Sequence, residues 1–284
     1  MSIDHLLLPS PAKLNLFLYI TGRRPDGYHD LQTLFLMLDH GDQLEFRRIP
    51  GEEIVLEPEI PGVPLEDNLI YRAVMKLKPH RKVSGGLWIG LRKVLPMGGG
   101  LGGGSSNAAT ALVAANRLWD CGLDEDALAE LGCGLGADVP VFVRGRTAFA
   151  EGVGERLVPV TVPGKWYLVV VPHAHVSTRE VFCHPDLIRN TPRRSWEQLR
   201  DLGWNNDFEP LVRRLCPEVD SAMNWLDRYG KAHLTGTGAC VFAEFASAEE
   251  AQAAFRALPP SWSGFVARGL MSSPLQEELA RQAG

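Results

Sequence analysis

The residues best suited to chemistry form one run, Pro96 to Asn107, which holds six glycines, two serines and an asparagine. Glycine backbone can turn several N–H groups toward one anion, because no Cβ restricts its φ angle. An alternating apolar segment, Leu87 to Leu91, precedes the run, and a predicted helix, Ala108 to Trp119, follows it. A helix N-terminus adds unpaired donors and partial positive charge. The order strand, glycine loop, helix therefore predicts a polyphosphate site.

Several known phosphate loops contain such glycines, so the type of loop has to be decided from its surroundings. Gly98-x-Gly100-x-x-Gly103 satisfies the dinucleotide fingerprint, but that site needs a second strand after the helix, with an acid about 20 residues on. Here the acids that follow lie in a loop and at the start of a second predicted helix, Asp124 to Leu135, where Asp124 fits an N-cap. A Walker loop is excluded, because no Gly-Lys-Ser/Thr follows the glycines. A flexible linker is the remaining alternative, and the short span between a strand and an alanine-rich helix disfavours it.

A second glycine turn, His233 to Cys240, lies far along the chain and leads into a predicted strand, Val241 to Phe245. Its sequence is Thr235-Gly236-Thr237-Gly238-Ala239-Cys240. The chain thus offers two phosphate-binding candidates, which is stronger evidence than one.

Two charged residues, Lys13 and Asp138, adjoin predicted strands. Lys13 precedes a half-buried strand pattern, Leu14 to Ile20, and shares one strand face with Asn15. Asp138 lies between glycines and a short β-branched segment, Val139 to Val143, for which we predict a strand. Each has a structural alternative: the lysine as a solvated surface charge, the aspartate as the cap of a turn.

The loop Gly22 to Asp30 presents two arginines, Tyr28 and His29, and could be a recognition loop or simply a hairpin turn. His173 and His175 form an H-x-H pair, which we interpret as a plain loop because no further ligand spacing surrounds it.

The remaining elements follow from hydrophobic periodicity and capping signals. Residues 31–38 form an apolar segment. Further strands are predicted within residues 42–46, 53–56 and 165–171, and further helices within residues 68–75, 176–182, 209–215, 220–229 and 248–258. A boundary near Arg156 to Gly164 divides the chain into two predicted domains, residues 1–157 and 158–284.

Composition is that of a soluble enzyme: 284 residues, 45% hydrophobic, 22% charged and a net charge of -5. The acidic balance disfavours nucleic acid as a partner, so an anionic substrate needs local donors and a metal ion. No apolar run approaches a membrane span, and the N-terminus does not resemble a signal peptide. The 5 cysteines lack CxxC spacing, which favours reduced thiols in a cytoplasmic protein. We expect a monomer or weak homodimer.

These motifs resemble those of a known family. Pro96 to Asn107 is similar to the second motif of the GHMP kinases, and Leu234 to Cys240 to the third. One branch of that family matches more closely, through motifs that span nearly the whole chain in the expected order: residues 11–16, 24–29, 95–109, 136–140 and 235–240.

The resemblance implies a two-domain α+β GHMP kinase fold, with an N-terminal domain like the second domain of ribosomal protein S5 and a ferredoxin-like C-terminal domain. It also implies ATP as co-substrate with Mg²⁺, and a cleft between the domains. In the closest branch, the substrate is a small cytidine diphosphate derivative of methylerythritol, whose 2-hydroxyl is phosphorylated in the non-mevalonate isoprenoid pathway. The alternatives are another GHMP small-molecule kinase and an inactive, nucleotide-sensing relative.

By the same resemblance, the catalytic pair is Lys13 and Asp138, and no metal ligand is assigned. The substrate-binding residues are Asn15, Tyr28, His29, Thr178, Phe182, Gly236, Thr237 and Gly238. Tyr28 and Phe182 would sandwich the cytosine, and His29 would recognise its polar edge. The ATP-binding residues are Asn68, Pro96, Met97, Gly98, Gly99, Gly100, Leu101, Gly102, Gly103, Gly104, Ser105 and Ser106.

Overall fold

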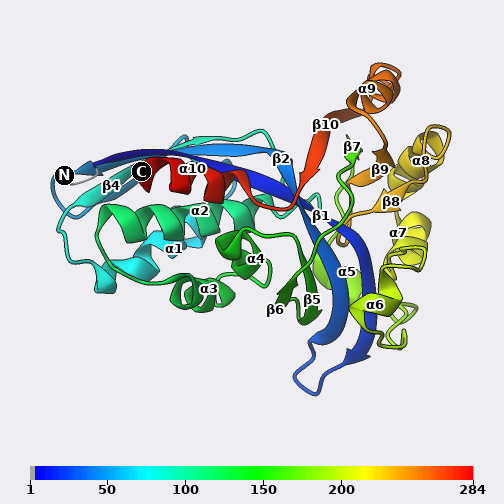
Figure 1. The fold of residues 1–284 in the computed structure, drawn as a ribbon, viewed down its shortest axis with the longest axis horizontal. Helices are drawn as coiled ribbons and strands as arrows, with labels where there is room; N and C mark the ends of the chain where they lie inside the picture. Colours follow the sequence, from blue (N-terminus) through cyan, green and yellow to red (C-terminus); the bar gives the residue numbers. More distant parts are fainter. Residues whose placement is uncertain (1–3, 284) are drawn as a thin grey trace.

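The computed structural model describes residues 4–283. Two long antiparallel strands, β1 (His5–Arg23) and β2 (His29–Ile49), run through the middle of the molecule (Figure 1). Sequence analysis predicts parts of β2 as two separate segments. They form one strand because pairing with β1 continues on both sides of the predicted gap, down to Pro11 opposite Gly41.

One mixed sheet connects the two halves of the chain, in the strand order β3-β4-β2-β10-β7-β9-β8. On the N-terminal side, β2 pairs with β4 (Gly86–Arg92) and β5 (Ala148–Gly152), β3 (Ile54–Glu57) lies parallel to β4, and β6 (Arg156–Pro159) pairs with β5. On the C-terminal side, β7 (Trp166–Val171) lies between β10 (Ser263–Leu270) and β9 (Val241–Phe245), with β8 (His233–Leu234) beside β9. The predicted domain boundary falls within β6.

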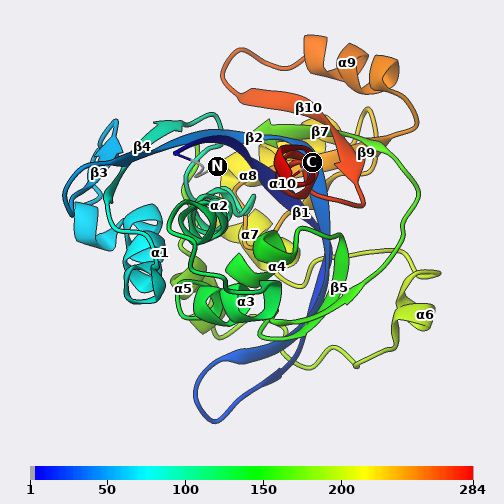
Figure 2. The ribbon, with the colours of Figure 1, turned by 60° about the vertical axis from the view of Figure 1, so that its left-hand side comes forward.

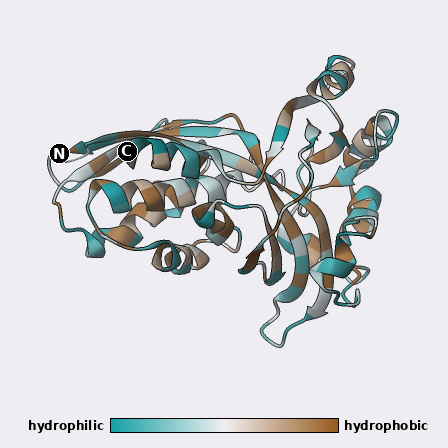
Figure 3. Cartoon of the chain, in the orientation of Figure 1, coloured by the Kyte–Doolittle hydropathy of each residue, from teal (hydrophilic) through white to brown (hydrophobic). Residues whose placement is uncertain are grey.

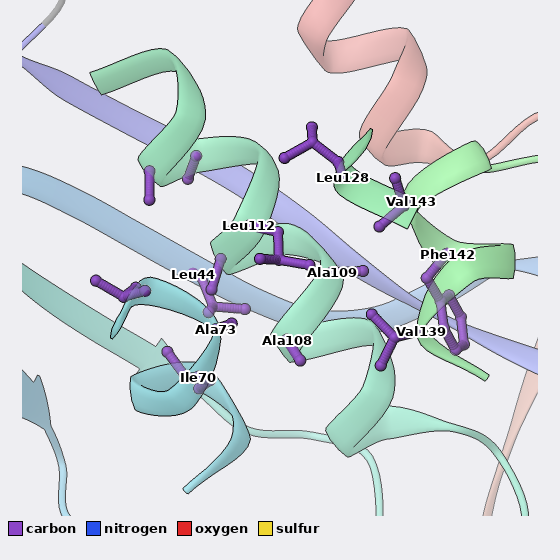
Figure 4. Packing of buried hydrophobic residues seen from close by; sticks show 14 of the residues in the cluster. Leu44, Ile70, Ala73, Ala108, Ala109, Leu112, Leu128, Val139, Phe142 and Val143 are labelled. Atoms are coloured by element: carbon purple, nitrogen blue, oxygen red, sulfur yellow. The ribbon is translucent and has the colours of Figure 1, made fainter. Parts of the chain in front are cut away.

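Four helices gather beside the N-terminal strands, as Figure 2 shows: α1 (Leu69–Leu77), α2 (Gly103–Leu118), α3 (Glu125–Cys133) and α4 (Val139–Arg144). Figure 4 shows their contact, where Ala108 and Ala109 of α2 lie among Ile70, Leu112 and Val139. Alanine side chains are short, so they let neighbouring helices approach closely. The glycine loop therefore leads into a helix that is packed on most of its sides.

The C-terminal half has its own buried cluster beneath helices that surround β7 to β10. These helices are α5 (Thr178–Cys183), α7 (Glu209–Leu215), α8 (Pro217–Leu226) and α9 (Ala248–Arg256). The short helix α6 (Trp196–Leu199) instead contributes Leu199 to a separate buried cluster that includes Phe17 and Phe149. The final helix, α10 (Pro274–Ala283), returns to β1 in the N-terminal half. Figure 3 shows apolar residues along β1 and β2 and mixed polarity around the outer helices.

The strand predicted over Val139 to Val143 is wrong, because this segment forms the helix α4. Pro140 lies in its first turn, where proline fits a helix, and Gly145 ends it at a φ of 59°. Val139, Val141 and Val143 are all buried, so packing overrides the β preference of valine.

The N-cap predicted at Asp124 is confirmed, because its carboxylate accepts a hydrogen bond from Ala127 N at 2.9 Å. We expect Asp124→Ala to lower the free energy of unfolding by about 1 kcal/mol, since the helix loses one satisfied N–H group. Denaturant unfolding measures this loss. Glu130→Ala, on an exposed site of the same helix, serves as the control and should change stability far less; equal effects of the two substitutions would count against the cap.

Candidate active site

The free edge of β1 positions the centre of the site. Alternate N–H groups of a strand point to the same edge, and here Lys13 N donates to Leu101 O and Asn15 N to Thr235 Oγ1, both at 3.0 Å. The pairing of β1 with β2 shifts register on either side of these two residues. Such irregularities are common beside active sites, where they redirect side chains. One strand edge thus binds both glycine segments.

The first glycine segment is a turn followed directly by a helix. Gly98, Gly100 and Gly102 have φ values of 70°, 76° and 73°, which side chains rarely adopt. The predicted helix starts five residues earlier than expected, at Gly103. Its first intrahelical bond runs from Ser106 N to Gly102 O at 2.8 Å, so the N–H groups of the preceding turn remain for an anion.

The two glycine segments pack backbone against backbone. Thr235 Oγ1 donates to Gly100 O at 3.2 Å, and Cys240 N donates to Gly99 O at 3.2 Å. A Cβ on Gly100 would lie 2.2 Å from Thr235 O, so glycine is required for this approach. The chain therefore brings together two motifs that are more than a hundred residues apart in sequence.

Lys13 is a buried cation beside one carboxylate. Its side chain is 3% exposed, and its Nζ lies 3.2 Å from Asp138 Oδ2. Nζ also donates to Gly100 O at 3.0 Å and to Asn15 Oδ1. Asp138 begins α4 without a side-chain cap bond, so its carboxylate remains available to the lysine. The predicted catalytic pair is thus in contact next to the glycine loop.

The aromatic end of the site joins β2 to α5. The Phe182 ring lies 5.1 Å from the His29 ring and 4.8 Å from Phe208. His29 is buried, and its burial, with the charges of Arg189 and Arg23, lowers the pKa of its imidazole. Thr178 and Thr237 share a hydrogen bond of 2.9 Å, which connects this end with the second glycine turn.

A cleft of about 570 Å³ contains nearly all of the predicted site. It is lined by the predicted residues Lys13, Asn15, Asn68, Pro96, Met97, Gly98, Gly99, Gly100, Leu101, Gly102, Gly103, Gly104, Ser105, Asp138, Thr178, Phe182, Gly236, Thr237 and Gly238. Three predicted residues do not line it. Ser106 is buried and hydrogen-bonded to Ser10, His29 is buried beside Phe182, and the Tyr28 side chain is 65% exposed.

Sequence analysis missed Asp42, which supports the glycine loop from β2. Its fully buried carboxylate accepts bonds from Val94 N and Leu95 N at 2.8 and 2.9 Å, and from Lys93 and Asn107 side chains at 2.5 and 3.0 Å. These contacts fix both ends of the loop. Asp42 lies in a polar stretch, Asp39 to Gln43, and nothing in that stretch indicated that its carboxylate would contact residues so far along the chain.

Residues for a metal are few. Within residues 4–283, no group of three or more histidine, cysteine, aspartate or glutamate side chains could hold an ion. Mg²⁺ usually keeps several waters and binds one or two carboxylates plus substrate phosphates. A carboxylate such as Asp138 and a hydroxyl such as Ser105 on the same cleft wall therefore suit a phosphate-bound Mg²⁺ better than a protein cage.

One cleft contains a glycine loop that opens a helix, a second glycine turn and a lysine–aspartate pair. Together these features define a small-molecule kinase of the GHMP class. The GHMP kinases N terminal domain matches residues 68–146, and the GHMP kinases C terminal domain matches residues 186–263. The chain is 56% identical to the 4-diphosphocytidyl-2-C-methyl-D-erythritol kinase of Tolumonas auensis over 97% of both chains. It is 57% identical to that of Vibrio cholerae over 96% of this chain and 94% of the relative. The chain belongs to the 4-diphosphocytidyl-2-C-methyl-D-erythritol kinase family.

Solved structures agree with this assignment. A crystal structure of 4-(cytidine 5'-diphospho)-2C-methyl-D-erythritol kinase has a TM-score of 0.81 and 31% identity, and the match covers 93% of this chain and 99% of that one. The mevalonate kinase of Methanococcus jannaschii, at 17% identity and a TM-score of 0.69 over 94% and 98% of the two chains, shares the fold. The predicted α+β two-domain GHMP kinase fold is confirmed.

Proposed function

We propose that this protein transfers the γ-phosphoryl group of ATP to the 2-hydroxyl of 4-diphosphocytidyl-2-C-methyl-D-erythritol, giving the 2-phosphate and ADP. The reaction belongs to the non-mevalonate route to isoprenoid precursors. The observation that carries the proposal is the 3.2 Å contact between Lys13 Nζ and Asp138 Oδ2, in the same cleft as the glycine loop. The family relationship supports the choice of substrate.

The pair suits proton transfer from an alcohol. Asp138 accepts the hydroxyl proton, and a neighbouring cation favours the ionised carboxylate that this task requires. The same ammonium group stabilises negative charge on the attacking oxygen and on the transferring phosphoryl group. Asn15 and the Gly100 carbonyl each accept a hydrogen bond from Lys13, so the amine is held in one place.

The glycine run, from Pro96 to Ser105, binds the triphosphate, while the buried Ser106 supports it through Ser10. Its backbone N–H groups and the N-terminus of α2 supply donors where the Walker loop would use a lysine. Asn68 lies near the adenosine; its side-chain oxygen already caps α1 through Ile70 N at 2.9 Å, and its amide group is left for the nucleotide. Mg²⁺, when bound, neutralises charge on the phosphate oxygens, and Ser105 and Asp138 are the residues that would help to hold it.

The cytidine substrate occupies the aromatic end of the cleft. Phe182 stacks on one face of the cytosine, Tyr28 closes over the other, and His29 recognises the polar edge. Asn15 and Thr178 orient the methylerythritol part, and the turn of Gly236, Thr237 and Gly238 lines its other side. The Tyr28 ring is largely exposed, so this stacking requires its side chain to turn toward Phe182.

At the level of the whole chain, we propose domains at residues 1–157 and 158–284, with an ATP-binding first domain and a substrate-side second domain. We also infer a cytoplasmic enzyme, monomeric or weakly dimeric, without a nucleic-acid partner. Among residues 4–283, no helix is long and apolar enough to cross a bilayer, and the 5 cysteines there are free thiols.

Turnover with purified protein, ATP and Mg²⁺ tests the proposal. ADP release that requires the cytidine diphosphate substrate is the expected result. Release only with homoserine or mevalonate would favour another GHMP kinase. ATP binding without any release would favour an inactive nucleotide sensor.

Tyr28→Ala should raise the KM for the cytidine substrate about 5- to 150-fold, because stacking of a base on an aromatic ring contributes about 1 to 3 kcal/mol. The KM for ATP should stay unchanged, since the Tyr28 side chain is largely exposed and does not line the cleft that contains the glycine loop. Initial-rate kinetics with each substrate varied in turn measure both values. A comparable loss for ATP would show that the ring has a different role.

A further inference from the structure

Arg189, which sequence analysis did not select, connects the two walls of the aromatic end of the cleft. Its Nε donates to His29 Nε2 at 3.1 Å. Its Nη2 donates to Phe182 O at 2.9 Å and to His184 O at 2.7 Å, and its Nη1 donates to Leu187 O at 3.0 Å. One half-buried guanidinium therefore joins the start of β2 to the end of α5.

This arrangement determines where the proton of His29 lies. An arginine side chain has N–H donors and no acceptor, and it is not deprotonated in proteins. A ring nitrogen that accepts from it must carry a lone pair, so His29 is neutral and its proton is on Nδ1. The same contact excludes the imidazolium form, in which both ring nitrogens are donors.

The other ring nitrogen is open to a ligand. Within residues 4–283, no hydrogen bond joins His29 Nδ1 to another protein atom, whereas Nε2 accepts one from Arg189, and the side chain as a whole is 7% exposed. His29 therefore offers one N–H donor without a protein partner beside the Phe182 ring.

A fixed donor at this place distinguishes two pyrimidines. Cytosine presents an unprotonated N3, which accepts a hydrogen bond, whereas uracil presents N3–H, which is itself a donor. Two donors facing each other in a desolvated site leave both unpaired, and an unpaired buried donor costs more than a hydrogen bond gains. A histidine free to change tautomer could accept from uracil instead.

Building on the proposed function, we propose that Arg189 is the positioning residue that makes the site select cytosine over uracil, by holding His29 as its Nδ1–H tautomer. Arg189 does not touch the base. It acts through the His29 ring and through the Phe182 carbonyl, which together fix the two surfaces that the base contacts.

Two measurements on the whole protein test this proposal. The first is ¹⁵N NMR of the histidine rings without any substrate, where His29 should show a protonated Nδ1 and an unprotonated Nε2. In Arg189→Ala, Nε2 should become protonated. A protonated Nε2 in the unsubstituted protein would overturn the proposal whatever the enzyme turns over.

The second measurement compares kcat/KM for the cytidine substrate with kcat/KM for its uridine analogue. Arg189→Ala should lower the cytidine-to-uridine ratio about tenfold, the value of one hydrogen bond, with the KM for ATP unchanged. Arg200→Ala is the control, because its side chain is exposed in the same connecting segment, and it should leave the ratio as it is. An unchanged ratio in Arg189→Ala, with cytidine turnover intact, would contradict the proposal and leave the proposed function standing.

A double-mutant cycle separates this role from simple support of the fold. His29→Gln should lower the ratio by itself, and adding Arg189→Ala should change it no further, because Arg189 acts through His29. Independent, additive effects would mean that Arg189 acts by another route and would overturn the proposal. If the unsubstituted enzyme does not act on the cytidine substrate at all, the proposed function fails, and base selection fails with it.

Discussion

Asp138→Asn should lower kcat by about 10²- to 10⁴-fold, the range of general-base catalysis. Asparagine keeps the size of the side chain but cannot take the proton of the substrate hydroxyl. The substitution also removes the carboxylate 3.2 Å from Lys13 Nζ. Steady-state kinetics at saturating substrates measure the effect, which should fall on kcat more than on either KM.

The fold should tolerate this substitution, because the Asp138 side chain caps no helix N–H group. Thermal unfolding of the variant checks this point. Asp201→Asn, at an exposed acid in the connection after α6, is the matched control and should keep normal kcat. A near-normal kcat in Asp138→Asn would remove Asp138 from the mechanism.

Gly100→Ala should lower kcat/KM for ATP by at least about fivefold, since strain at a special backbone position costs roughly 1 to 3 kcal/mol. The φ of Gly100 is 76°, and a Cβ there would lie 2.2 Å from the carbonyl oxygen of Thr235. A backbone atom cannot rotate away as a side chain would, so the two glycine segments must separate. Lys13 would then lose its fixed contact with Gly100 O.

Gly164→Ala is the control for this prediction, because a Cβ at Gly164 would meet no atom within 4 Å. Kinetics with ATP varied, together with thermal unfolding, should separate the two variants. Unchanged kinetics and stability in Gly100→Ala would mean that the two glycine segments are not held together as described.

Local sequence patterns predicted much of the fold. Asn68 and Asp124 are residue types that favour the N-cap position, and each caps the helix that follows it. The strand β9 has the predicted bounds. Where the prediction failed, tertiary contacts decided the outcome. Val139 to Val143 are helical because their side chains are buried against α2 and α3. The helix α2 starts at Gly103, before its predicted start, because the preceding glycine turn already directs the backbone along the helix. The strand β10 was missed because its residues lack strict alternation.

The candidate site was predicted where a motif carries its own chemistry. The glycine loop, Lys13 and Asp138 all lie along one cleft. The residues that support them, Asp42 and Arg189, were not predicted, because a buried carboxylate and a half-buried guanidinium are ordinary in sequence. Their importance comes from distant partners, such as Leu95 for Asp42 and His29 for Arg189.

The most direct test of the central claim is ³¹P NMR of the reaction products from the purified protein with ATP, Mg²⁺ and 4-diphosphocytidyl-2-C-methyl-D-erythritol. The proposed reaction predicts one new phosphomonoester signal, formed in step with ADP, while the two signals of the cytidine diphosphate linkage persist. A new signal from inorganic phosphate alone, or loss of the diphosphate signals, would contradict transfer to the 2-hydroxyl.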